Sequence, residues 1–451
     1  MRRLIFDAKV ALAQRPERRA AADFRAAESL APPALRRLQH ARASAMARHA
    51  FTTTDYYRER FSAAGFSEKD LSEPENWAHL PRLTKDDIRI AGQAMFSDAV
   101  TDRRRLLSRT GGSTGIPLSV YNDDNAPTAA MWWRVYRWWG IHPGDHVAFI
   151  YRQARSGITA VQYAARWWPT RHLLLDARNT STAAIEEFSA RWQRLRPSLL
   201  VGYVEGVHEF ARYLHETGTT LPSPQAISVT ASGLQPGQRR FIEATFNAPV
   251  YDTYRSAEVP WIAAECGKRT GLHVQADTRR LEILTSANTP AGPGQTGDVV
   301  LTDLMNYAFP LIRYEIGDRA QTIGGDCTCG SSLPRISALQ GRRADVVHTP
   351  SGRRISGGYG GLFNRWPELV RQFQIHQSED YVITLRFVPA GDERRAVRAA
   401  EEVARTITDF VDGEVPVRLA VVDRIDHDGG KVRLVTSDVT RIPYTSERRD
   451  R

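Results

Sequence analysis

Cysteine, lysine and long apolar runs are all scarce in this 451-residue chain. Three cysteines cannot form a disulfide framework in so long a chain, so we expect a reducing, cytoplasmic location. No apolar run approaches the length needed to cross a membrane, and the N-terminus reaches polar residues too soon for a secretory signal. The composition therefore predicts a cytoplasmic protein without a membrane partner.

Lysine accounts for only 5 of the 61 basic residues, which leaves 56 arginines in a chain of net charge +10. The arginines are scattered and form no basic tail, and we find no basic cluster interleaved with aromatic residues. A general preference for arginine explains this balance without nucleic acid. Anionic small molecules such as nucleotides or coenzyme A fit the charge equally well. A nucleic-acid-binding protein remains as a rival hypothesis, and salt-dependent oligonucleotide binding would support it.

Hydrophobic patterning predicts an α/β fold in a large N-terminal domain, residues 1–340. Residues 1–65 read as helices, and a turn at Pro81–Asp87 feeds a helix capped by Thr84. From Leu281 onward, short strands and turns predict an antiparallel β subdomain. Between these regions strands alternate with helices, which is the βαβ signature of mostly parallel sheets. The strands are predicted at His146–Tyr151, Leu173–Leu175, Ser198–Gly202 and Ala226–Thr230, and the helices at Thr182–Arg194, Gly206–Thr217 and Pro236–Phe246.

A break near Gly341 separates a second, smaller domain, residues 341–451. Its length of about 110 residues lies within the usual range for a domain. Its signals run strand, strand, helix, strand, which predicts an α+β fold. These elements are expected at Val370–His376, Tyr381–Val388, Arg394–Asp412 and Val417–Val422.

Glycine and hydroxyl residues gather in the segment Ser108–Pro117. Three glycines let backbone N–H groups turn toward an anion, and four Ser and Thr hydroxyls add donors. A Walker loop would need a lysine after Gly115, so a P-loop NTPase is disfavoured. Taken alone, such a cluster is more often a polar surface turn. The segments that follow it favour an anion-binding loop.

Five further segments follow this loop in a characteristic order. They are Asp252–Glu258, Gly297–Asp303, Arg313–Asp318, Gly341–Asp345 and, near the end, Gly429–Arg433. In this order and spacing the chain resembles the adenylate-forming superfamily of acyl-CoA synthetases, adenylation domains and luciferases, and most of all its phenylacetate–CoA ligase branch. The resemblance covers roughly residues 80–440.

The resemblance implies a ligase that uses ATP and Mg²⁺ to convert a carboxylic acid, aryl acids among the candidates, into an acyl-adenylate. Coenzyme A is the acceptor it implies. An amine or a carrier-protein thiol is the alternative acceptor, and a nucleotide-binding protein without turnover is the alternative from another class. The C-terminal domain would be a mobile lid that rotates between two poses. The oligomeric state is left open.

The resemblance also implies roles for individual residues. Tyr254 would stack on adenine, since a flat ring loses little entropy on binding a base. Glu258 would hold Mg²⁺, a hard cation that prefers oxygen ligands. Asp318 would accept hydrogen bonds from both ribose hydroxyls. The loop Thr110, Gly111, Gly112, Ser113, Thr114 and Gly115 would hold the β- and γ-phosphates, and Ser232, Gly233 and Arg342 would complete the nucleotide site.

Lys431 stands in a Gly-Gly-Lys turn and is compositionally unusual in so arginine-rich a chain. Attack of a carboxylate on the α-phosphate brings two anions together. A compact ammonium near the forming bond offsets that repulsion, and the broad guanidinium of arginine would not occupy the same point-like site. Solvated surface lysines are commoner, but position and motif together favour a catalytic role for Lys431.

The acid-binding site is expected near an aromatic stretch, Met131–Trp139, although most of these rings should belong to the core. The candidates for contact with the acid are Tyr136, Trp139, Arg255, Ser256 and Ala257. Three positions depart from the family pattern, one of them Ala344, which stands where an acidic residue is common, so that Asp345 would take that role. Ile116 replaces a common loop lysine, and Arg255 replaces a usual glycine, where it could pair with an acidic substrate or narrow the pocket.

All three cysteines flank the predicted β subdomain. Cys266, Cys327 and Cys329, together with His273, would make a Cys3His set, which is a standard tetrahedral arrangement for structural Zn²⁺. Three free or buried thiols and an unrelated histidine are the alternative. Some members of the resembled branch carry such a site, which favours zinc.

Overall fold

The computed structural model describes residues 1–13, 15–109, 118–151, 157–177, 181–339, 346–351, 354–356, 359, 362–363, 365–366, 368–425 and 434–439. The chain divides into two compact units, Met1–Gln340 and Gly341–Arg451. Within the described ranges, no helix combines the length and apolarity that a bilayer crossing requires.

The first unit begins with helices, as predicted for residues 1–65. Thr84 caps the fifth of them through a capping box, in which its hydroxyl accepts from the N–H of Asp87 and the Asp87 carboxylate accepts from the N–H of Thr84. The predicted cap is therefore confirmed. The helices are α1 (Arg2–Ala13), α2 (Arg15–Ala27), α3 (Pro32–Thr53), α4 (Asp55–Ala63) and α5 (Lys85–Ala91).

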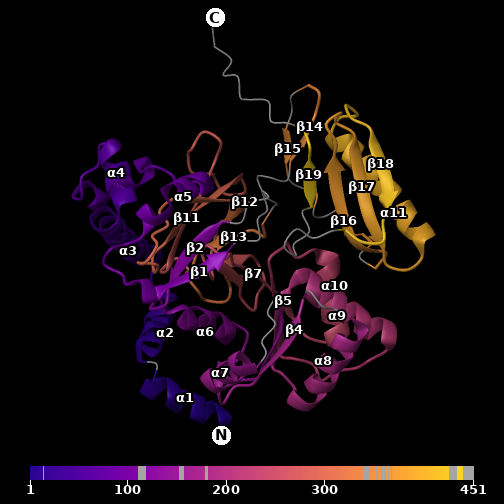
Figure 1. The fold of residues 1–451 in the computed structure, drawn as a ribbon, viewed down its shortest axis with the longest axis horizontal. Coiled ribbons are helices and arrows are strands. Elements are labelled where there is room, and N and C mark those ends of the chain that lie inside the picture. The colour runs from indigo at the N-terminus through magenta and orange to yellow at the C-terminus, as the bar shows by residue number, and fades with distance from the viewer. Residues whose placement is uncertain are drawn as a thin grey trace, which may run out of the picture. The chain divides into compact units, whose positions relative to one another are not determined.

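Five parallel strands form the centre of this unit, and four helices connect them or lie beside them. Residues alternate between two faces, because successive side chains of a strand point in opposite directions. On one face Ala148, Leu200 and Ile227 pack against α8, α9 and α10 (Figure 1). On the other face Val147 and Leu199 pack with α6 (Thr128–Trp138) and α2. The strands are β3 (Val147–Tyr151), β4 (His172–Asp176), β5 (Leu199–Tyr203), β6 (Ala226–Thr230) and β7 (Val250–Tyr254), and the helices are α7 (Gly157–Trp167), α8 (Thr182–Leu195), α9 (Val204–Thr217) and α10 (Pro236–Phe246).

Antiparallel strands extend the parallel block, so the sheet is mixed and not mostly parallel. Its described order is β10-β11-β12-β13-β9-β8-β7-β6-β5-β3-β4. The parallel pairs are confined to β3–β7, where helices cross over between strands, and all pairs from β7 to β10 are antiparallel. The added strands are β8 (Ala263–Glu265), β9 (Leu272–Val274), β10 (Arg279–Leu284), β11 (Thr296–Asp303), β12 (Tyr314–Ile323) and β13 (Arg335–Ile336).

The glycine-rich loop connects the two strands of a separate β-hairpin. Its strands β1 (Arg105–Arg109) and β2 (Ser119–Asp123) are antiparallel, and Arg109 pairs with Ser119. The residues on the two sides of the loop therefore lie at neighbouring positions on paired strands.

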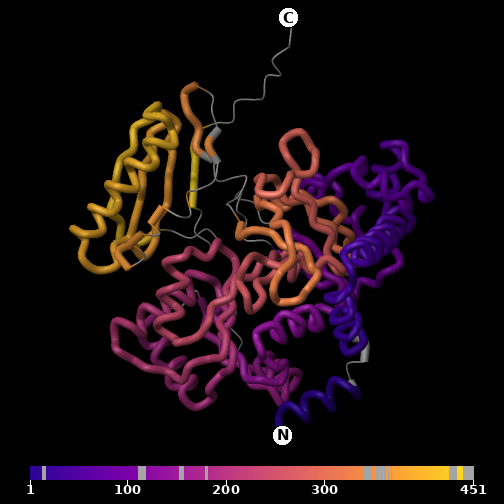
Figure 2. The backbone as a smooth tube through the Cα atoms, turned by 180° about the vertical axis from the view of Figure 1, so that it is seen from behind, coloured from indigo at the N-terminus to yellow at the C-terminus, as the bar shows by residue number. Residues whose placement is uncertain are grey.

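The predicted strand, strand, helix, strand order is confirmed in the second unit, and its described residues add a fourth strand, β19, that the sequence did not predict. The strand order of the sheet is β18-β17-β16-β19. Figure 2 shows α11 (Glu393–Phe410) lying along this sheet, and Ala396, Val403 and Ile407 are buried against it. The strands are β16 (Val370–Gln377), β17 (Ile383–Pro389), β18 (Val417–Val421) and β19 (Val435–Ser437), beside a short hairpin of β14 (Val346–His348) and β15 (Arg354–Ser356).

Candidate functional site

The five parallel strands end on polar residues at one edge of the sheet. Open α/β sheets bind their ligands at the carboxyl ends of such strands. Three neighbouring strands end on tyrosine or threonine: Tyr203 on β5, Thr230 on β6 and Tyr254 on β7. The sequence-predicted residues Tyr254, Ser232 and Gly233 lie at this edge or directly after it.

Tyr254 and Asp318 come from segments 64 residues apart and are hydrogen bonded to each other. The Tyr254 hydroxyl donates to Asp318 Oδ2 over 2.8 Å, and both side chains are buried. Asp318 belongs to β12, and three strands separate β12 from β7 in the sheet order. The antiparallel half of the sheet must therefore curl back toward β7. This contact brings together the two residues predicted to hold adenine and ribose.

Glu258 is the third predicted residue of this group and is also buried. Its Oε1 accepts a hydrogen bond of 3.1 Å from the Tyr314 hydroxyl, again a contact to β12. Burial and the neighbouring Glu258 carboxylate raise the pKa of Tyr314, so its phenol stays protonated and can donate. Two tyrosine–carboxylate hydrogen bonds thus link the segment Tyr254–Glu258 to β12. Tyr254 donates to Asp318 of β12, and Tyr314 of β12 donates to Glu258.

A buried arginine fixes the start of β12. Arg313 has a positive φ of 48°, which is uncommon for a residue with a side chain. Its guanidinium donates to the backbone oxygens of Ala78 and Leu80 and forms an ion pair with Glu282. These bonds hold the backbone one residue before Tyr314 and five before Asp318.

The turn after β6 carries two further predicted nucleotide residues. Ser232 donates to Glu205 Oε1 over 2.5 Å, so its hydroxyl is engaged with α9. Ala231, just before it, has a positive φ of 83°. The Thr230 hydroxyl is buried and has no hydrogen-bond partner among the described residues. Strained backbone and an unpaired polar atom are typical of turns that bind a ligand.

Arg255 reaches from the end of β7 across the carboxyl edge toward β3. Its guanidinium donates to the Tyr151 hydroxyl and lies over the Trp261 ring, 4.4 Å from Cζ to the ring centroid. Ser256 is engaged in a turn, because its hydroxyl accepts from the N–H of Val259 over 2.9 Å. No interaction assigns a role to Ala257.

The two predicted aromatic contacts with the acid differ in their surroundings. Trp139 stacks on Tyr251 at a centroid distance of 4.9 Å, and its indole N–H donates to the backbone oxygen of Glu265. This geometry gives Trp139 a packing role in the core. Tyr136 is buried too, but its ring lies 6.3 Å from that of Trp261, beside the Arg255 cluster.

Three of the predicted elements lie outside the described residues: the phosphate loop Thr110–Gly115, Arg342 with the nearby Ala344 and Asp345, and Lys431. For the loop, the structure describes its flanking strands alone. The roles of these residues stay predictions.

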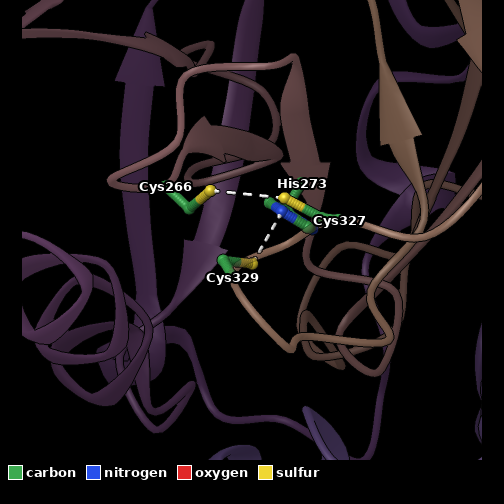
Figure 3. Close-up of side chains that lie close together, drawn as sticks. All are labelled: Cys266, His273, Cys327 and Cys329. Atoms are coloured by element: carbon green, nitrogen blue, oxygen red, sulfur yellow. Dashed lines mark hydrogen bonds between the residues drawn. The ribbon is translucent and has the colours of Figure 1, made fainter.

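The cysteines and His273 converge into one cluster, as Figure 3 shows. Cys266 follows β8, His273 lies on β9, and Cys327 and Cys329 come from the turn between β12 and β13. The four ligand atoms all lie within 4.8 Å of one another. The Sγ atoms of Cys266 and Cys327 are 3.8 Å apart, and Cys329 Sγ lies 3.4 Å from His273 Nε2. The structure therefore brings together four residues that the sequence grouped only by type.

Hydrogen bonds from the surrounding backbone and side chains orient the four groups of the cluster. His273 Nδ1 is 2.8 Å from the backbone oxygen of Leu333 and donates to it, which leaves the Nε2 lone pair facing the thiols. Burial disfavours ionisation of Cys327, but the Cys329 backbone N–H, Thr270 and His273 outweigh it and lower the pKa of Cys327 to about 6. Backbone N–H groups of Lys268 and Ser331 donate to the Sγ atoms of Cys266 and Cys329.

Several known proteins of similar sequence or fold are CoA ligases. No protein-family model matches the chain. Protein CapK of Staphylococcus aureus is 25% identical over 278 residues, which covers 59% of this chain and 59% of CapK, less than two thirds of its length. The phenylacetate-coenzyme A ligase of Escherichia coli is 27% identical over 329 residues, or 69% of this chain and 72% of that enzyme.

A solved 2-hydroxyisobutyryl-CoA ligase, in complex with its acyl-AMP, superposes with a TM-score of 0.73 at 20% identity and covers 89% of both chains. The chain shares the fold of this ligase. The resemblance to the phenylacetate–CoA ligase branch, drawn from sequence motifs, is confirmed by these sequence matches. The α/β architecture with a large mixed sheet and a smaller separate sheet is the one this fold has.

Sequence reasoning missed Tyr151 and Trp261, which contact Arg255, and Tyr203, which packs against Tyr151. Tyr151 closes a strand that the sequence did predict, and the rule that ligands bind at strand carboxyl ends could have singled it out. Trp261 carried no such signal, because its place beside Arg255 depends on a positive φ of 54° that no sequence pattern reveals.

Proposed function

We propose that this protein is an ATP-dependent ligase that activates a carboxylic acid as an acyl-adenylate and transfers the acyl group to coenzyme A. The observation that carries the proposal is the convergence of Tyr254, Glu258 and Asp318, joined through β7 and β12 at the carboxyl edge of the parallel strands. An aromatic ring and two carboxylates at such an edge suit adenine, a metal ion and ribose. The similarity to phenylacetate-coenzyme A ligases supports the choice of reaction.

In the first half-reaction a carboxylate oxygen attacks the α-phosphorus of ATP. The bond between the α- and β-phosphates breaks, and pyrophosphate leaves. Glu258 would hold Mg²⁺, which neutralises the phosphate oxygens, and Asp318 would orient the ribose. The loop Thr110–Gly115 would hold the departing phosphates, and Lys431 of the second unit would stabilise the charge that develops at the α-phosphate.

In the second half-reaction the sulfur of coenzyme A attacks the carbonyl carbon of the acyl-adenylate. The bond from that carbon to the AMP oxygen breaks, and AMP leaves. Each half-reaction needs different groups beside the same acyl-adenylate. We propose that residues 341–451 act as a lid that serves both steps, residues 1–340 holding ATP and the acid.

The test of the proposed function is pyrophosphate release over a panel of aryl and aliphatic acids, with and without coenzyme A. We expect slow, acid-dependent release alone, and multiple turnovers with a thioester product when coenzyme A is present. An amine or a carrier-protein thiol that replaces coenzyme A in this assay would reassign the acceptor. Failure with every acid, alongside turnover of ATP with another substrate, would contradict the assignment to carboxylic acids.

We also propose that Cys266, His273, Cys327 and Cys329 hold a structural zinc ion. Thiolates that lie about 2.3 Å from a tetrahedral zinc are about 3.8 Å from each other. The separation of Cys266 and Cys327 matches that value, and the Leu333 carbonyl orients His273 as a ligand. With four protein ligands no position would be open, so the ion would join β8, β9 and the turn before β13 and take no part in catalysis.

Asp318→Asn is expected to raise the KM for ATP by about 10- to 100-fold, because hydrogen bonds to a charged acceptor are each worth about 1.5–3 kcal/mol. Tyr254→Phe, which keeps the ring but removes the hydroxyl that donates to Asp318, should have a smaller effect. Asp124→Asn, at an exposed position, is the matched control. Steady-state kinetics with ATP varied would measure this, and an unchanged KM for ATP in Asp318→Asn would remove the ribose assignment.

A further inference from the structure

A half-buried cation without a carboxylate partner lies at the carboxyl edge of the parallel strands. Among the described residues, the one acceptor that the Arg255 guanidinium reaches is the Tyr151 hydroxyl, and no Asp or Glu lies within ion-pair distance of it. A guanidinium carries five N–H donors, so most of its hydrogen-bonding capacity is unused here. Arginines that are removed from water are normally paired with an anion. No described residue supplies an anion to this arginine, so it is available for one from a ligand.

Aromatic side chains hold the guanidinium in place. Trp261 lies under it, with Cζ 4.4 Å from the ring centroid, and Tyr151 flanks it at 5.5 Å. Tyr203, at the end of β5, packs edge-on against Tyr151 with centroids 4.9 Å apart. These contacts fix the position of the positive charge, and no carboxylate of the described residues compensates it.

The backbone beneath Arg255 is strained in a way that serves this arrangement. Trp261 is a bulky residue with a positive φ of 54°, a conformation that glycine adopts at far lower cost. Although this conformation is unfavourable, it places a large ring under the guanidinium. Strain retained at one residue of a ligand-binding edge indicates a function for that residue.

The position of the cation relative to the proposed nucleotide site defines what it can contact. Arg255 directly follows Tyr254, and its side chain crosses the ends of β6 and β5 to reach β3. Thr230 ends β6 along this path, and its buried hydroxyl has no partner among the described residues. A positive charge, a hydroxyl without a partner among the described residues and several aromatic rings thus lie at the carboxyl edge beside Tyr254, the residue proposed to bind adenine.

We propose that Arg255 selects carboxylic acids that carry a second anionic group, such as dicarboxylates, and binds that group away from the reacting carboxylate. The proposal rests on the proposed function, because it assigns the acid side of that site. Tyr136 and Tyr151 supply aromatic walls for the body of the substrate, and Trp261 is a positioning residue for the guanidinium. The reacting carboxylate itself stays free to attack ATP.

The test compares matched acids in wild-type protein and in Arg255→Met. The probes are isophthalate, homophthalate and adipate, each paired with its monoamide, which has nearly the same size but one negative charge fewer. For wild type we expect kcat/KM to favour the diacid by about 10- to 100-fold, the range for a hydrogen-bonded charge. Arg255→Met should abolish that ratio, Arg255→Lys should retain part of it, and Trp261→Gly should reduce it without removing the charge.

Arg280→Met is the matched control, because Arg280 also stacks on a tryptophan, Trp77, but on β10 and away from this edge. The affinity for each diacid is measured in parallel by calorimetry, which does not require turnover. If wild type turns over diacid and monoamide with equal kcat/KM, and Arg255→Met does the same, the inference is overturned and the proposed function stays intact. Diacid binding that requires Arg255, without pyrophosphate release, would support the inference and overturn the proposed function. Absence of both diacid binding and diacid turnover in wild type would overturn the inference.

Discussion

Replacement of Lys431 by methionine is expected to lower acid-dependent pyrophosphate release by about 100- to 1,000-fold, the range for removal of a group that stabilises transition-state charge. The ammonium offsets repulsion between the attacking carboxylate and the α-phosphate, and methionine keeps the length of the side chain without its charge. Lys431→Arg should restore little, because the planar guanidinium does not fit a point-like site. Single-turnover assays with radiolabelled ATP would measure the effect.

The second half-reaction provides the internal control for this prediction. Supplied with a chemically synthesised acyl-adenylate, Lys431→Met should still form the thioester, because the sulfur attacks carbon and no phosphate charge builds up. Lys268→Met, a change at an exposed lysine, should affect neither step. Equal losses in both half-reactions would show that Lys431 acts through folding or lid position and not on the α-phosphate.

Loss of the metal is expected to be the most damaging change to stability. The purified protein should contain about one equivalent of zinc, and Cys327→Ser should lose it and lower Tm by on the order of 10 °C, because structural zinc contributes several kcal/mol to folding. Four ligands from three separate segments converge here, so no smaller set can hold these strands together in the same way. Elemental analysis and thermal unfolding would measure both effects.

A strong chelator separates metal loss from other consequences of the substitution. It should lower the Tm of wild type toward that of Cys327→Ser and leave the variant unchanged. Thr270→Val is the matched control, since the Thr270 hydroxyl lies 3.6 Å from Cys327 Sγ without belonging to the ligand set, and it should keep its zinc. Wild-type protein that is free of metal yet equally stable with and without chelator would contradict the zinc assignment.

The elements of the fold were largely predictable, because their signals are local. The predicted helix Pro236–Phe246 and strand Ala226–Thr230 match the observed elements, and most other predicted ends differ by one or two residues. Hydrophobic periodicity and caps depend on neighbouring residues alone. The antiparallel strands predicted from Leu281 onward are confirmed, but their union with the parallel block in one sheet was not predictable, because it depends on β13 pairing with β9, which lies far earlier in the sequence.

In the candidate site, too, local sequence signals were predictable and contacts between distant segments were not. Tyr254, Glu258 and Asp318 could be named from motif order, but the hydrogen bond from Tyr254 to Asp318 arises because the antiparallel strands curl back toward β7. Trp139 looked like a substrate contact in the sequence, whereas the structure buries it between Tyr251 and the Glu265 backbone. The cation held by Trp261 depends on one backbone torsion, which no spacing of residues encodes.

The short strand β8 stands between the two sites of the first unit. Thr253 on β7 pairs with Ala264 on β8, and Ala264 pairs with His273 on β9, so one row crosses three strands. Two strand spacings, about 10 Å, separate the residue beside Tyr254 from the metal ligand. The proposed zinc cluster and Tyr254, which is proposed to bind adenine, therefore lie on neighbouring strands of one sheet. We therefore expect loss of the proposed zinc ion to weaken nucleotide binding as well as to lower Tm.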